Sequence, residues 1–181
     1  MKRRTLVQAS AAGVVLAGLG VVGHVADEQW SLGATDGEGW RPMAWPFPRD
    51  AWPAGKAWQR DGTEVYVRLK LGFCGNCDTG VVTDEEVDKV TDLDLLDERF
   101  TPVGPGSKIR ITDLVGRSRI YKYKNWTGDH LAEGIAVNYK CDLLVAVVVG
   151  DVTNEKVRKA AHLFLESNTP QVWINAQLEG R

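Results

Sequence analysis

The sequence has few of the features that catalysis usually requires. Residues 27–181 contain no Gly-x-Ser-x-Gly nucleophile motif, no phosphate-binding loop and no dinucleotide-binding fingerprint. Histidine occurs three times in 181 residues, which leaves little material for a hydrolytic triad. These absences favour a protein that is not an enzyme of these classes.

An excess of positive charge is also missing. The chain carries 22 Lys and Arg against 24 Asp and Glu, and three of the basic residues lie in the first 26 positions. The remaining residues are therefore mildly acidic, with 19 basic and 24 acidic side chains. Because nucleic-acid binding requires a basic surface, this balance argues against it.

Long apolar runs are absent after residue 26, but one is present before it. Residues 6–25 are mostly Ala, Gly, Val and Leu, and their length is about that of a helix spanning a bilayer. They follow a short basic end, as the apolar region of an export signal does. We therefore assign residues 1–26 to a cleaved signal peptide or an uncleaved membrane anchor, outside the folded domain.

The basic end carries the most specific motif of the chain. Residues 3–8, Arg-Arg-Thr-Leu-Val-Gln, resemble the twin-arginine (Tat) export signal, with paired arginines at Arg3 and Arg4, a free position and apolar Leu6 and Val7. Gln8 stands where the pattern usually has a lysine. The resemblance implies that the Tat translocation machinery exports the protein already folded. We therefore expect a periplasmic location, soluble or anchored to the inner membrane through residues 6–25. The rest of the chain resembles only uncharacterised exported bacterial proteins, which implies no mechanism.

Residues 27–60 are rich in tryptophan and proline. Five of the seven tryptophans fall here, together with four of the seven prolines, and this proline density excludes regular helices and central strands. We therefore expect an extended arm over 27–60, followed by a folded domain over 61–181. We favour tryptophans that anchor the arm on the same chain; the alternative is a partner-binding surface made by Trp40, Trp45, Trp52 and Trp58.

Apolar patterns in the folded domain predict a sheet. Residues 64–71 alternate between apolar and polar, which predicts a half-buried strand. The valine-rich run 142–149 predicts a central strand covered on both faces. The other predicted strands cover 108–114 and 118–124, joined by a turn at 115–117, and 172–175 after Pro170, while 129–139 fit either a strand or a short helix.

Two helices have clear start signals. Thr83-Asp84-Glu85-Glu86 has the form of a capping box and predicts a short helix to about Val90. Thr153 is the expected cap of a longer helix, from Asn154 to about Glu166, whose apolar residues recur at helical spacing. Because strands outnumber helices without regular interleaving, we predict an α+β fold. It consists of a mainly antiparallel sheet with one principal C-terminal helix packed on it.

The three cysteines permit several kinds of chemistry. Cys74 and Cys77 have two residues between them, and Cys141 stands alone. A Cys74–Cys77 disulfide is the leading interpretation, because an oxidising compartment favours it. Catalytic thiol exchange through the pair, metal binding by the pair, and pairing of Cys141 with one of the two are the alternatives.

The two chemical alternatives have weak support. Thiol exchange normally uses a helix N-terminus to stabilise a thiolate, whereas Asp78 follows Cys77 directly and adds negative charge. Zinc or copper would need ligands beyond the pair, for which Cys141 and His130 are the candidates. We therefore predict no cofactor, with zinc or copper at these four residues as the alternative.

Charge is segregated along the chain. Residues 84–98 are strongly acidic, whereas the strands predicted around 68–70 and 108–124 are basic. The acidic residues lack the spacing of a calcium-binding loop, so a solvated helix face is their simplest interpretation. We favour the interpretation that the acidic segment and the basic strands pair with each other inside the protein. The alternative is that the basic strands form a surface for an anionic partner.

These features predict an exported, non-catalytic accessory or binding protein of the bacterial cell envelope. Its expected partner is an envelope protein, and membership of a larger complex is one form that this role can take. The alternative is a thiol-disulfide redox or metal-handling protein centred on Cys74 and Cys77.

Overall fold

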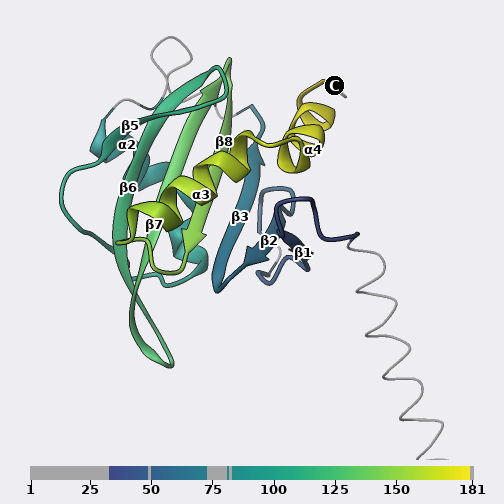
Figure 1. The fold of residues 1–181 in the computed structure, drawn as a ribbon. Coiled ribbons are helices and arrows are strands. Elements are labelled where there is room, and N and C mark those ends of the chain that lie inside the picture. Colours follow the sequence, from purple (N-terminus) through teal and green to yellow (C-terminus); the bar gives the residue numbers. More distant parts are fainter. Residues whose placement is uncertain (1–32, 49, 73–80, 82, 180–181) are drawn as a thin grey trace, which may run out of the picture.

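The computed structural model describes residues 33–48, 50–72, 81 and 83–179 (Figure 1). In chain order, the elements are β1 (Arg41–Met43), β2 (Lys56–Arg60), β3 (Thr63–Lys70), α2 (Asp84–Val90), the 3-10 helix η1 (Asp92–Leu95), β4 (Thr101–Pro102), β5 (Ser107–Ile111), β6 (Leu114–Asn125), β7 (Gly128–Tyr139), β8 (Asp142–Val149), α3 (Glu155–Glu166) and α4 (Asn168–Glu179).

One antiparallel sheet forms the centre of the described part. Its strand order is β1-β2-β3-β8-β7-β6-β4, and β5 pairs with β6 beside this path. Every strand pair is antiparallel. Helices α3 and α4 lie on one face, with α3 running across the strands (Figure 1). The predicted α+β class with a mainly antiparallel sheet is confirmed.

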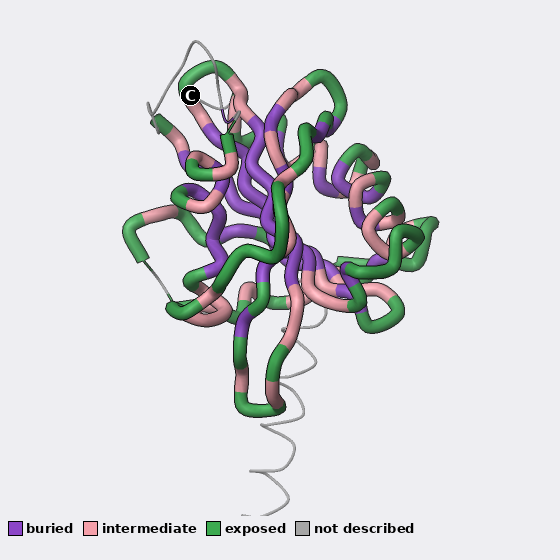
Figure 2. Tube along the Cα trace, turned by 90° about the vertical axis from the view of Figure 1, so that its left-hand side faces the viewer, coloured by how far each residue is buried: buried purple, intermediate pink, exposed green. Residues whose placement is uncertain are grey.

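The sheet is buried on both faces. Along β8, Leu144 and Ala146 belong to the core under α3 and α4, whereas Leu143 and Val145 pack with α2 residues on the opposite face. The continuous apolar run over 142–149 therefore forms a central strand covered on both sides, as predicted. Figure 2 shows this buried centre in purple, with exposed residues gathered at the loops and at the end of the β6–β7 hairpin.

Strand β3 is more deeply buried than its alternating pattern predicts. Only Glu64 among its eight residues is not classed as buried, and the inward-facing apolar residues are matched by buried Arg68 and Lys70 on the other side. The prediction of a half-buried strand is wrong, because neighbouring segments cover its charged face.

The two predicted helix starts are confirmed, with one change of cap. Thr83 forms a full capping box with Glu86 at the start of α2. Helix α3 is capped by Asn154, whose side chain accepts from the Lys156 N–H, rather than by Thr153.

The predicted strand at 172–175 is wrong, because these residues lie in α4. Proline fits the first turn of a helix, where its missing N–H leaves no bond unmade, so Pro170 opens a helix here. Pro170, Ile174 and Leu178 recur every four residues and contact the core or its margin. The sheet is therefore covered by two consecutive C-terminal helices rather than one.

The hairpin turn between β5 and β6 lies earlier than predicted. It is formed by Thr112 and Asp113, and Thr112 has a φ of 52°. The predicted turn over 115–117 is wrong, because Gly116 is in the strand. A Cβ at this position would lie 2.0 Å from the Ala136 carbonyl oxygen, so this glycine permits close approach of β7. Residues 129–139, which fitted two interpretations, belong to strand β7.

The acidic segment pairs with the basic strands. Asp88 on α2 accepts from Arg119 at 2.8 Å and from the Tyr121 hydroxyl at 2.6 Å. The Gly106 N–H and the Arg117 guanidinium both bind Asp84 and hold the pKa of that carboxyl below its usual value. The favoured interpretation of internal complements is confirmed for these pairs, so the α2 acids are not a simple solvated face.

Among the described residues, the helices are all too short or too polar to cross a bilayer. The proposed anchor, residues 6–25, lies outside the described residues, as do Arg3, Arg4 and Leu6 of the export motif.

Candidate functional site

A groove of about 360 Å³ lies between the first turns of α3 and the hairpin of β5 and β6. Its β5 side is formed by the four consecutive residues 107–110, and its floor includes Ser118 of β6 and Glu133 of β7. Helix α3 contributes the remaining side chains, which are Glu155, Arg158, Lys159 and His162.

The floor of the groove contains a buried carboxylate. Glu133 is 1% exposed and lies two residues before Ile135, so that both side chains point toward α3. Its Oε2 is 3.0 Å from Nε2 of His162. The two atoms are within hydrogen-bond distance, and the tautomer of the imidazole decides which of them donates. The contact satisfies a group that would be costly to bury alone.

Cations lie on both faces of the β5 edge beside the groove. Arg158 and Lys159 line its α3 face, together with Glu133 and Glu155. Lys108 and Arg110 alternate with the inward-facing Ile109 and lie on the opposite face of the same edge. In the described part of the chain, the Nε of Arg158 is buried and has no hydrogen-bond partner. The positive excess at this edge therefore comes from Lys108 and Arg110, and it favours an anionic group beside β5.

One side of β5 is open to a further strand. Within the described residues, β5 pairs with β6 on one side only. Alternate residues of an antiparallel strand direct their N–H and C=O groups away from the paired neighbour. Three of the five β5 residues, Ser107, Lys108 and Arg110, are exposed. This edge offers backbone hydrogen bonds beside the cationic rim.

Two of the four tryptophans predicted to bind a partner are core residues. Trp40 is 1% exposed and Trp58 is 5% exposed, and both pack on Phe164 of α3. In this fold they offer no surface to a partner, so the partner-binding interpretation is corrected for this pair. The segment that holds them also supplies β1 and β2, so residues 41–43 and 56–60 belong to the sheet rather than to a separate arm. Pro42 is tolerated because β1 is an edge strand.

The other two tryptophans cover buried cations on the opposite face of the sheet. Trp45 lies 5.9 Å from the Arg68 guanidinium, and Trp52 lies 5.8 Å from the Lys70 ammonium. Both are partly exposed. Their packing on the same chain agrees with the favoured interpretation of the tryptophan-rich segment as self-anchored.

Cys141 takes part in a disulfide bond. It lies in the turn between β7 and β8, and the chain contains only two other cysteines. A bridge within the chain therefore uses Cys74 or Cys77, and the predicted Cys74–Cys77 bridge is incompatible with it. Cys74 and Cys77 themselves lie outside the described residues.

Cysteine mapping tests this pairing. When the denatured, non-reduced protein is alkylated, we expect Cys141 to stay unmodified and one cysteine, at position 74 or 77, to react. The bridge closes a loop of roughly 65 residues, which restricts the unfolded chain by about 4 kcal/mol. Peptide mapping by mass spectrometry is the measurement, and an alkylated Cys141 beside an unmodified pair would contradict the assignment. Prior reduction should make all three cysteines reactive.

The predicted metal-ligand set does not form one site. His130 lies near the tip of the β6–β7 hairpin, where its Nε2 is 2.6 Å from the Thr127 hydroxyl, whereas Cys141 lies beyond the other end of β7. The intervening strand places the two on the order of 30 Å apart. Zinc or copper cannot be held by both, and the described residues contain no other cluster of three or more metal-ligating side chains.

Sequence reasoning missed two residues of functional interest. Glu133 falls in the inward alternation of Leu131, Ile135 and Val137, and an acid in that series is a signal that could have identified it. Trp126 is 95% exposed between β6 and β7, at the end of the hairpin that extends beyond the sheet (Figures 1 and 2).

No protein-family model matches the chain, and no curated protein matches it. The function is therefore argued from the residues and their geometry.

Proposed function

We propose that this chain is a non-catalytic binding protein of the cell envelope, exported by the Tat machinery to the periplasm, where it is an accessory to another envelope protein. The observation that carries the proposal is the groove between β5 and α3, whose β5 edge has cations on both faces. The groove combines fixed polar groups with an open sheet edge, which are features of recognition.

Two further observations support this role. The disulfide at Cys141 agrees with an oxidising compartment, where such bonds persist. The imidazole of His162 is engaged by Glu133, so the groove presents charged donors for binding more readily than a free general base.

Export is the first part of the proposal to test. With a reporter that is active only outside the cytoplasm fused to the C-terminus of the full chain, we expect activity in the periplasm or at the membrane. The double variant Arg3→Lys/Arg4→Lys should abolish it, while the matched variant Arg41→Lys should not. A reporter that stays cytosolic with the unaltered chain would refute the proposal. Cell fractionation then separates a soluble form from one anchored by residues 6–25.

Partner binding is the second part. Purification of the full chain from native membranes and periplasm, after crosslinking in the cell, should recover an envelope protein in a fixed ratio. Recovery of the chain alone under these conditions would argue against an accessory role.

The thiol-redox alternative is favoured by one observation. If Cys141 is bridged to one residue of the pair, the other residue is a third cysteine close to a disulfide, as thiol exchange requires. If a Cys74→Ser variant folds normally but no longer reduces a test disulfide, the protein is a thiol-redox protein and the accessory proposal fails. A variant with an unchanged reduction rate, or a wild-type protein without such activity, would dismiss the redox alternative.

A further inference from the structure

We infer that the groove between β5 and α3 binds an extended acidic peptide segment of the partner protein, which adds to the sheet along the free edge of β5. This inference rests on the proposed function, because it names the kind of partner that the binding protein recognises.

The backbone edge sets the conformation of the ligand. Residues 107–110 line the groove consecutively, and among the described strands only β6 pairs with β5. An extended segment can therefore accept and donate hydrogen bonds along the open side, as in other cases of strand addition. Five residues of β5 match a segment of about five residues, roughly 17 Å long.

The walls set the charge of the ligand. Side chains of an added strand alternate between the two faces. Ligand side chains on the α3 face would meet Arg158 and Lys159. Lys108 and Arg110 alternate with the inward-facing Ile109, so ligand side chains on the opposite face would meet these two cations. Acidic residues on either face of the segment would thus meet a cation, whereas basic residues would be repelled.

Arg158 is the most specific recognition element. Arg158 lines the groove, and its buried Nε has no hydrogen-bond partner in the described part of the chain. A carboxylate in the groove would let the guanidinium turn and form the charge-assisted contact that it lacks. Glu133 and Glu155 also line the groove, but neither of them accepts a hydrogen bond from this Nε. A ligand carboxylate is therefore the complement that the groove lacks.

The test measures binding of synthetic peptides to the purified full-length protein. The probe is a fluorescein-labelled nonapeptide of alternating Glu and Val, followed by fluorescence anisotropy. We expect it to bind at least tenfold more tightly than the corresponding Lys and Val peptide, and binding should weaken as salt is raised. Methylation of alternate backbone nitrogens should abolish binding, because it removes the donors that pair with β5.

Matched variants locate the site. Arg158→Gln should weaken binding of the acidic peptide roughly tenfold, as expected for loss of a charge-assisted hydrogen bond. Arg41→Gln, on the exposed edge strand β1, removes the same charge elsewhere and should leave binding unchanged. Should Arg158→Gln fail to fold, Lys159→Gln is compared with Lys56→Gln, which is exposed on β2.

Three outcomes would overturn the inference: equal binding of the acidic and basic peptides, equal loss for the two arginine variants, or binding of inorganic phosphate without binding of the peptide. Failure here is distinguishable from failure of the proposed function. If the peptide does not bind but the exported protein still recovers its envelope partner, only the inference about the groove is lost. If the protein is not exported, the proposed function fails whatever the peptide does.

Discussion

Replacing Asp92 by Asn is expected to lower the free energy of unfolding by about 3–5 kcal/mol, because it leaves two buried cations without their shared anion. Asp92 is 6% exposed, between Arg68 at 4% and Lys70 at 10%. The Arg68 Nε and Nη2 atoms lie 2.7 and 2.6 Å from the two carboxylate oxygens, and the Lys70 Nζ lies 2.8 Å from one of them. The amide of Asn has one oxygen and no charge, so it cannot replace this forked contact.

The remaining partners compensate only in part. Asp50 binds the Nη1 of Arg68 at 2.6 Å but is about one-third exposed, and the carbonyl of Val90 accepts from Lys70 without carrying a charge. Trp45 and Trp52 cover the cations and limit their access to water. Water therefore cannot fully solvate the unpaired cations, and their cost lowers the free energy of unfolding.

An exposed ion pair on the same sheet is the control. Lys122 and Asp129 are 2.7 Å apart, and both side chains are at least half exposed. Asp129→Asn should leave the urea midpoint almost unchanged, because exposed pairs contribute little to stability. Urea denaturation of both variants, followed by circular dichroism, gives the comparison. Similar small losses for both would show that Asp92 is not an essential buried counter-ion.

Features that depend on neighbouring residues were predictable from the sequence. The capping box at Thr83 satisfies backbone donors within its own turn, so its residues are sufficient to indicate the start of α2. Residues 143–149 are all apolar and rich in valine, which is typical of a strand covered on both faces.

Features that depend on contacts between distant segments could not be predicted from the sequence. The alternation in β3 separates apolar from charged residues, but it does not reveal that Asp92 and Trp45, far along the chain, cover Arg68. For the same reason the solvated interpretation of the acidic segment failed at Asp92. Pro170 is compatible with the start of a helix or of a strand, and packing of Ile174 on the sheet decides between them.

The candidate groove shows the same division. Its charged residues are visible in the sequence, yet β5 and α3 are separated by more than forty residues, and no local pattern brings them together. Recognition of 129–139 as a strand would have placed Glu133 inward with Ile135. The partner of that carboxylate, His162, is known only from the packing of α3.

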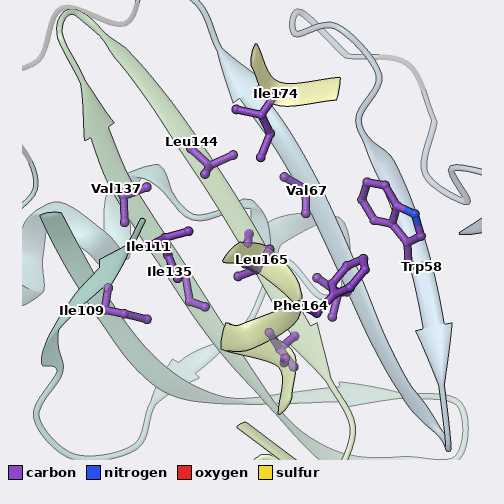
Figure 3. Close-up of a cluster of buried hydrophobic side chains, with 14 of the residues drawn as sticks. Trp58, Val67, Ile109, Ile111, Ile135, Val137, Leu144, Phe164, Leu165 and Ile174 are labelled. Carbon is purple, nitrogen blue, oxygen red and sulfur yellow. The ribbon is translucent and has the colours of Figure 1, made fainter. Parts of the chain in front are cut away.

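The second large effect is expected at Phe164, where substitution by Ala should cost about 3–5 kcal/mol. Phe164 is fully buried and stacks on Trp40 with ring centroids 4.3 Å apart, while Trp58 approaches edge-on at 5.3 Å. Figure 3 shows its side chain projecting from α3 toward Trp58 and the strand that carries Val67. Removing the ring deletes apolar contacts and leaves a cavity between rigid aromatic neighbours, which cannot collapse to fill it.

The adjacent Leu163 provides a control on the same helix. It is 53% exposed, so Leu163→Ala removes a side chain of similar hydrophobicity without opening the core, and alanine is a strong helix former. We expect a change within about 0.5 kcal/mol. Urea denaturation followed by circular dichroism measures both, and the tryptophan emission of folded Phe164→Ala should change because two indoles lose their neighbour. Equal losses for the two variants would mean that helix stability, rather than contact with Trp40 and Trp58, is what position 164 contributes. A loss confined to Phe164→Ala would instead show that the tryptophan-rich segment is joined to the C-terminal helix as one core.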